Sequence, residues 1–140
     1  GVYNLKLLRL YNYIAQQEGI DCTVVHSLDG YDEISLTSPF KVSSSEGERL
    51  YTPAQLGFDT ASQASLYGGD TVDESAVIFD NVLAGKGTKP QTDCVVANSA
   101  FAIHTLEPEV SIDEAIRQAR ESISSGAALG AFRRFVEINS

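Results

Sequence analysis

Hydrophobic and polar positions follow two different periods along the chain, a helical one near the N-terminus and a strand-like one after it. Apolar residues recur at helical spacing between Asn4, which can cap a helix, and Gly19, which can end one. A run of β-branched residues then predicts a buried strand at Thr23–His26. Beyond the turn signal at Asp29–Gly30, a second strand is expected at Glu33–Thr37.

A hairpin and a short helical turn are expected in the centre of the chain. Phe40–Ser43 and Arg49–Thr52 have strand patterns on either side of a turn at Glu46–Gly47. The next segment, Pro53–Gly57, follows a threonine and has the proline start, the capping glutamine and the final glycine of a single helical turn.

Capping signals predict further helices in the second half. Thr71 with Glu74 and Ser111 with Glu114 form potential capping boxes, and Pro90 suits the first turn of a helix between them. A glycine separates the last of these helices from a final apolar segment. Helices at both ends and strands between them predict an α/β fold.

The helix expected after the proline has an unusual composition. Its body, Val95–Ile103, is apolar or small on every side, which is typical of a helix that is buried on most sides. The strands expected in this chain are few and short, so partner elements are missing from the chain or come from a second copy. An unpaired sheet edge predicts association or strand exchange.

The charge balance excludes several classes of partner. The chain has 140 residues, a length that suits one domain, with 10 Lys and Arg against 19 Asp and Glu and a net charge of −9. Nucleic acids and anionic membrane surfaces attract basic faces, so neither is expected to bind here. No apolar run approaches the roughly 18 residues that cross a bilayer.

Cysteine and methionine usage adds two expectations. Cys22 and Cys94 lie in apolar, β-branched surroundings with no shared spacing, which predicts free, reduced thiols in a cytoplasmic protein. The chain contains no methionine and starts at Gly1, so we expect a processed product, a trimmed chain or a piece of a longer one.

Candidate chemistry is densest at His26–Glu33, directly after the first predicted strand, where open α/β sheets place their ligands. Asp32 and Glu33 are adjacent carboxylates that can converge at a turn, and Mg²⁺ prefers one or two such ligands completed by phosphates and water. The alternative is a solvated acidic turn. His26 is a possible general base, although a lone histidine at a strand end is more often structural.

Other clusters favour structural interpretations. Gly68–Asp70 precedes a helix N-terminus, which is a common anion-binding position. Here Asp70 places a negative charge at that position, and helix capping explains the residues without a bound anion. Gly85–Thr88 departs from the phosphate-loop pattern and is expected to be a helix end followed by a turn. Two histidines and two cysteines at long spacings form no zinc pattern.

The segment Val24–Ser35 resembles the Asp-Glu motif of anthranilate phosphoribosyltransferase. The resemblance continues through Tyr51–Gly57, Tyr67–Asp70, Leu83–Thr88 and Val96–Ala100 to the end of the chain. It implies an enzyme that transfers the phosphoribosyl group of phosphoribosyl pyrophosphate to anthranilate, giving N-(5-phosphoribosyl)anthranilate and pyrophosphate in tryptophan biosynthesis.

The same resemblance implies a metal site at the paired acids. In that family a vicinal Asp and Glu hold Mg²⁺ against the pyrophosphate, and they match Asp32 and Glu33 here. The ion offsets charge that develops on the leaving pyrophosphate. No catalytic or substrate-binding residue of the family is matched elsewhere in the chain.

The resemblance is confined to the C-terminal part of the family's α/β domain. Residues 1–140 are then one partial portion of a nucleoside phosphorylase/phosphoribosyltransferase catalytic domain, with a short mixed sheet and helices. The glycine-rich pyrophosphate loop and the N-terminal helical domain through which the intact enzyme forms a homodimer are not among these residues, so we expect the chain alone to be inactive. A related pyrimidine or nucleoside phosphorylase and a non-catalytic, nucleic-acid-binding relative are the alternatives, and the net charge argues against the second.

Overall fold

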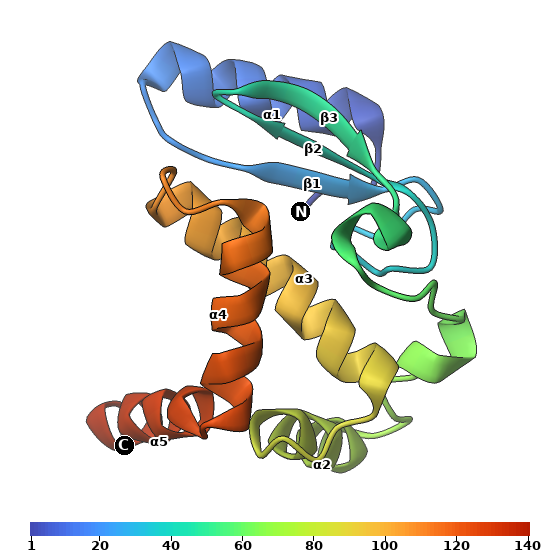
Figure 1. Cartoon of the computed structure of the whole chain (residues 1–140), viewed down its shortest axis with the longest axis vertical. Helices are drawn as coiled ribbons and strands as arrows, with labels where there is room; N and C mark the ends of the chain where they lie inside the picture. Colours follow the sequence, from blue (N-terminus) through green and yellow to red (C-terminus); the bar gives the residue numbers. More distant parts are fainter.

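A three-stranded antiparallel sheet separates one helix from the other four (Figure 1). The computed structural model describes residues 1–140. The regular elements, in chain order, are helix α1 (Leu5–Glu18), strands β1 (Val24–Ser27), β2 (Phe40–Ser44) and β3 (Gly47–Tyr51), short 3-10 helices η1 (Pro53–Leu56) and η2 (Gln63–Leu66), and helices α2 (Val72–Leu83), α3 (Lys89–Leu106), α4 (Ile112–Ser124) and α5 (Ala127–Ile138). The α/β class predicted from the sequence is confirmed.

The strands are adjacent in the order β1-β2-β3, with Val25 opposite Val42 and Val42 opposite Arg49. Both pairings are antiparallel, whereas a mixed sheet was expected. The strand predicted at Glu33–Thr37 is also wrong, because this segment is an irregular loop. The Ser35 hydroxyl accepts a hydrogen bond from the Thr37 backbone N–H and so competes with a strand ladder. Leu36 has a φ of 60°, which no strand accommodates.

Helix α1 covers one face of the sheet and forms as predicted. The Asn4 side chain accepts a hydrogen bond from the Leu7 backbone at 2.9 Å, and Gly19 ends the helix in the left-handed conformation. Its buried Leu8 packs with Val2 and Val24 in a small apolar cluster on this face.

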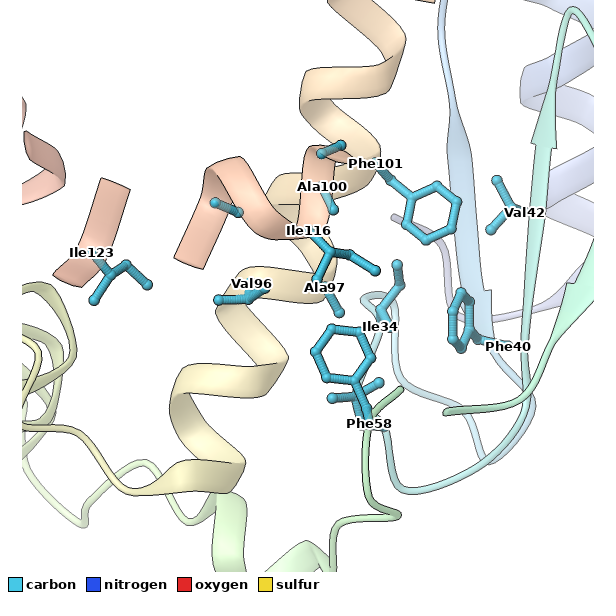
Figure 2. Packing of buried hydrophobic residues seen from close by; sticks show 13 residues of the cluster. Ile34, Phe40, Val42, Phe58, Val96, Ala97, Ala100, Phe101, Ile116 and Ile123 are labelled. Carbon is cyan, nitrogen blue, oxygen red and sulfur yellow. The ribbon is translucent and has the colours of Figure 1, made fainter. Parts of the chain in front are cut away.

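The main core lies on the other face of the sheet, against α3 and α4 (Figure 2). Phe40 and Tyr51 from the hairpin stack at 5.7 Å between ring centroids, and Phe101 of α3 meets the Phe40 ring edge-on at 5.9 Å. Rings arranged in this way gain about 0.5–1.5 kcal/mol beyond the area that they bury. The aromatic cluster therefore joins the sheet to α3.

Helices α3 and α4 are also joined by one ion pair at a buried carboxylate, which a second ion pair within α3 shares. The Asp93 side chain is 4% exposed, with Lys89 Nζ 2.6 Å from one of its oxygens and Arg120 2.8 Å from the other. Arg120 in turn lies over the ring of Phe58. A carboxylate taken out of water needs such partners, so these contacts fix how α4 crosses α3.

The Val95–Ile103 part of α3 is buried or half-buried except at Val95 and Ala102, so the enclosure expected of it is incomplete. Val96, Ala97 and Phe101 are buried, but Val95 and Leu106 are exposed. The helix packs against α4, and its exposed residues stay uncovered within this chain.

Helix caps and cysteines follow the sequence with one difference. Thr71 and Ser111 cap α2 and α4 through their hydroxyl oxygens, but neither capping box is complete. The Glu74 carboxylate instead accepts from the Asp70 backbone at 2.6 Å. Both cysteines are unpaired, as expected. None of the helices has the length and apolar character needed to cross a bilayer.

Candidate metal-binding loop

The loop Leu28–Pro39 follows β1 and carries the paired acids Asp32 and Glu33 on its exposed side. Its ends meet, because the Leu28 backbone donates to the Pro39 carbonyl at 2.9 Å. Neither acid takes part in any salt bridge of the chain. Two adjacent carboxylates thus face solvent with their oxygens uncommitted.

Two other Asp-Glu pairs occur in the chain, and both have structural roles at the start of a helix. Asp73–Glu74 and Asp113–Glu114 occupy the first turns of α2 and α4, where negative charge offsets the helix dipole. The Glu114 carboxylate also pairs with Arg117 at 2.6 Å. The pair at Asp32–Glu33 neither begins a helix nor forms a salt bridge, and this distinguishes it from the other two pairs.

A network of hydroxyl groups holds the inner side of the loop to β1. Ser27, the last residue of the strand, donates its hydroxyl to the Glu33 carbonyl at 2.7 Å and accepts from the Ser35 backbone at 3.2 Å. The Ser35 and Thr37 hydroxyls lie 2.7 Å apart and continue the network. The Glu33 backbone is therefore tied directly to the end of the buried strand.

Asp29 completes this network. Its carboxylate is already hydrogen-bonded, whereas those of Asp32 and Glu33 are free to bind a ligand. The Asp29 carboxylate accepts hydrogen bonds from the hydroxyls of Thr37 and Ser38, the latter at 2.8 Å. Of the three acids that the sequence places in this cluster, one thus shapes the loop and two remain exposed.

Helix α3 holds the loop from the other side through Asn98. The Asn98 side chain accepts from the Ile34 backbone N–H at 3.0 Å and donates to the Ile34 carbonyl at 2.8 Å. The Cys94 thiol donates to the same carbonyl at 2.9 Å. Burial, together with the nearby charges of Glu33 and Asp93, raises the pKa of the Cys94 thiol to about 12.

The histidines take no part in this loop's chemistry. His26 is buried, with its Nδ1 2.9 Å from the Val2 carbonyl, and His104 Nδ1 lies 2.7 Å from the Val110 carbonyl. These are backbone contacts, which support a structural role over general-base chemistry for His26. No group of three or more His, Cys, Asp or Glu side chains in the chain could hold a metal by itself.

The glycine clusters are structural too. The Asp70 N–H, which an anion would need, is occupied by the Glu74 carboxylate. Gly85 turns left-handed after α2, and Thr88 forms a capping box with Gln91 at the start of α3. Both structural interpretations drawn from the sequence agree with these contacts.

A well-formed hollow lies elsewhere in the chain. A cavity of about 350 Å³ opens between the hairpin and helices α3 and α4, near the start of β1, and its lining includes Arg49, His104 and Ser111 but neither Asp32 nor Glu33. The paired acids therefore lie on an open surface, not in a pocket that this chain encloses.

Sequence reasoning missed the residues that hold the loop, namely Ser27, Ser35 and Asn98. A signal for one of them was present, because Asn98 is an amide in the middle of the apolar Val95–Ile103 segment. A buried or half-buried amide needs a partner, and here its partner is the loop backbone.

Two anthranilate phosphoribosyltransferases match the chain over its full length. It is 51% identical to the anthranilate phosphoribosyltransferase of Phocaeicola vulgatus and 49% identical to that of Bacteroides thetaiotaomicron, each match covering 100% of this chain. The match covers 42% of each of these relatives, so the chain spans less than half of their length.

Solved structures agree on the fold. Anthranilate phosphoribosyltransferase from Thermus thermophilus superposes with a TM-score of 0.87 at 26% identity, covering 98% of this chain and 41% of that one. The enzyme from Saccharomyces cerevisiae in complex with PRPP and Mg superposes at 0.85 and 24% identity, covering 98% of this chain and 39% of that one.

A family description matches at the level of sequence as well. Residues 1–129 match the α/β domain of a glycosyl transferase family. That range includes the loop, the sheet and helices α1 to α4 in full. By this match over most of its length, the chain belongs to the glycosyl transferase family with this α/β domain.

Proposed function

We propose that this chain is the metal-binding part of an enzyme that transfers phosphoribosyl from phosphoribosyl pyrophosphate to the nitrogen of anthranilate. The observation that carries the proposal is the 51% identity over all 140 residues to a relative of that name. The relatives described above share this name, which favours transfer to anthranilate over the transfer from a nucleoside to phosphate that a phosphorylase carries out.

Within this enzyme, Asp32 and Glu33 are proposed to hold Mg²⁺. The donor set fits the ion: two hard carboxylate oxygens on an exposed loop, free of salt bridges, leave the remaining positions to phosphate and water. Bound there, Mg²⁺ would offset the charge on the departing pyrophosphate. The absence of a third protein ligand agrees with a site that the substrate completes.

The loop supplies the positioning that such chemistry needs. Ser27 fixes the Glu33 carbonyl, and Asp29 gathers the hydroxyls of the loop's second half. Preorganised ligands avoid reorganisation when charge develops, which is a large part of electrostatic catalysis. The chain's own contribution is therefore to present two carboxylates on a fixed backbone.

Activity is proposed to belong to a longer chain, in which the relatives' remaining length supplies the other substrate contacts. The resemblance further implies a homodimer for that longer chain and a cytoplasmic location, the compartment expected from two free thiols. We expect the 140-residue chain, mixed with phosphoribosyl pyrophosphate, anthranilate and Mg²⁺, to leave the fluorescence of anthranilate unchanged. Measurable consumption of anthranilate would overturn the inactivity of the chain alone.

A binding experiment tests the metal site. Paramagnetic Mn²⁺ with inorganic pyrophosphate should broaden backbone NMR signals of Leu28–Leu36 in the natural chain. A double Asp32→Asn/Glu33→Gln variant should lose this broadening, and a matched Asp73→Asn/Glu74→Gln variant should keep it. Equal broadening in both variants, or none in the natural chain, would contradict the assignment.

A further inference from the structure

We infer that Asn98 of α3 is a positioning residue that sets the direction of Glu33 in the paired-acid loop. The inference rests on the proposed function, since it concerns the metal ligands of that site. Asn98 lies 64 residues along the chain from Ile34, yet its amide binds both polar groups of that residue's backbone, at 3.0 and 2.8 Å.

The decisive observation concerns one peptide unit. The peptide that joins Glu33 to Ile34 has its carbonyl bound by the Ser27 hydroxyl at 2.7 Å and its N–H bound by Asn98 at 3.0 Å. Because a peptide is planar, two bonds on opposite ends of one unit fix its rotation. Strand β1 and helix α3 thus hold the same plane from two sides.

Side-chain packing alone would not achieve this. Ile34 is fully buried and lies among Ala97 and Phe40 in the core (Figure 2), so its side chain fixes where the loop attaches. A buried side chain still leaves the preceding peptide free to rotate, and that rotation would swing the Glu33 carboxylate. Asn98 removes this freedom.

The rest of the Asn98 environment supports the same role. Its Nδ2 also lies 2.9 Å from the Cys94 carbonyl of its own helix, which orients the amide, and the Cys94 thiol shares the Ile34 carbonyl. Asn98 is thus oriented by one contact and bound by two others to the backbone of Ile34, the residue next to the proposed ligand Glu33. This arrangement is similar to that of the outer partners of metal ligands, whose loss costs about 10–100-fold in metal affinity.

The experiment compares Asn98→Leu, which has similar size and no hydrogen bonds, with Ser99→Ala, the next residue on the same helix. Affinity for Mn²⁺ with inorganic pyrophosphate should fall about tenfold or more in the first and stay within about twofold in the second. Amide exchange at Glu33–Ser35 should accelerate in Asn98→Leu, while exchange in α3 away from the substitution stays slow.

Each outcome bears on a separate claim. Mn²⁺ affinity that Asn98→Leu leaves unchanged, in a chain that binds the ion, overturns the positioning role. A natural chain that binds no Mn²⁺ at this loop overturns the proposed metal site, and unchanged amide exchange at Glu33–Ser35 then overturns the role of Asn98 as well. If Asn98→Leu does not fold, Asn98→Asp keeps an acceptor for the Ile34 N–H, loses the donor to its carbonyl, and is held to the same two measurements.

Discussion

Helices α3 and α4 differ from α2 and α5 in what their apolar residues touch. The first two bury residues against the sheet and against each other. In contrast, α2 buries Val82 alone and α5 buries no residue. Helices α2 and α5 meet through an edge-on pair of rings, Phe79 and Phe132, with centroids 4.9 Å apart.

This difference shows that an amphipathic helix needs a packing surface for its apolar side, and that the pattern alone does not reveal whether the chain contains that surface. Phe135 and Ile138 of α5 are 63% and 83% exposed despite a clear apolar stripe along that helix. Helical stability in proteins comes mostly from tertiary packing. The two helix pairs should therefore respond very differently to equivalent substitutions.

The largest difference is expected between two phenylalanines. Phe101→Ala removes a ring that is 4% exposed and contacts both Phe40 and Tyr51, so it should lower the free energy of unfolding by about 3–5 kcal/mol. Phe135→Ala, on α5, should change it by about 0.5 kcal/mol or less. Urea denaturation measures both, and similar losses would remove the distinction between the regions.

The Cys94 thiol offers a second test within the packed region. Its pKa is raised from 9.0 to about 12, chiefly by burial, so near pH 8 its thiolate is about a thousandfold rarer in the folded than in the unfolded chain. Alkylation by iodoacetamide in a Cys22→Ser background should slow accordingly on folding. Equal rates in buffer and in urea would show that this face of α3 is open.

The same thiol gives the stability a pH dependence with a definite sign. The folded state retains the proton that the unfolded state releases, so this group's contribution is fully present below pH 9 and is lost as the pH rises toward 12. A Cys94→Ser variant in the same background should show a weaker decline of unfolding free energy over that interval.

The smallest difference is expected at the helix caps. Ser111→Ala removes the cap of α4 and should lower the global free energy of unfolding by about 1 kcal/mol. Thr71→Ala removes the equivalent cap of α2, and its effect should appear mainly as faster amide exchange within Val72–Leu83. A global loss of the same size in both variants would show that α2 unfolds together with the rest of the chain.

Much of the fold could be predicted from short sequence patterns that mark helix ends and turns. Asn4 and Gly19 bound α1 as expected, and the hairpin and the capped turn at Pro53 formed where their residues predicted. Such features depend on neighbours in the chain, which a sequence displays directly.

Long-range contacts account for what the sequence could not reveal. The backbone of the strand expected at Glu33–Thr37 is instead bound by Ser27, at the end of β1, and by Asn98 of α3, which lies 64 residues along the chain from Ile34. The exposure of Val95 likewise depends on which surfaces face α3. The paired acids were identified by resemblance, and their assignment as metal ligands stays a prediction.

The hydrogen bond that joins Leu28 to Pro39 has a consequence for how the protein can change. Because the loop closes on itself at its base, the ends of β1 and β2 stay joined whichever side chains its exposed tip carries. Ile34 and Leu36 anchor the second half of the loop in the core, so substitutions there would disturb the packing. The exposed positions of Asp32 and Glu33 are therefore where evolution or a protein engineer could alter ligand preference while leaving the scaffold intact.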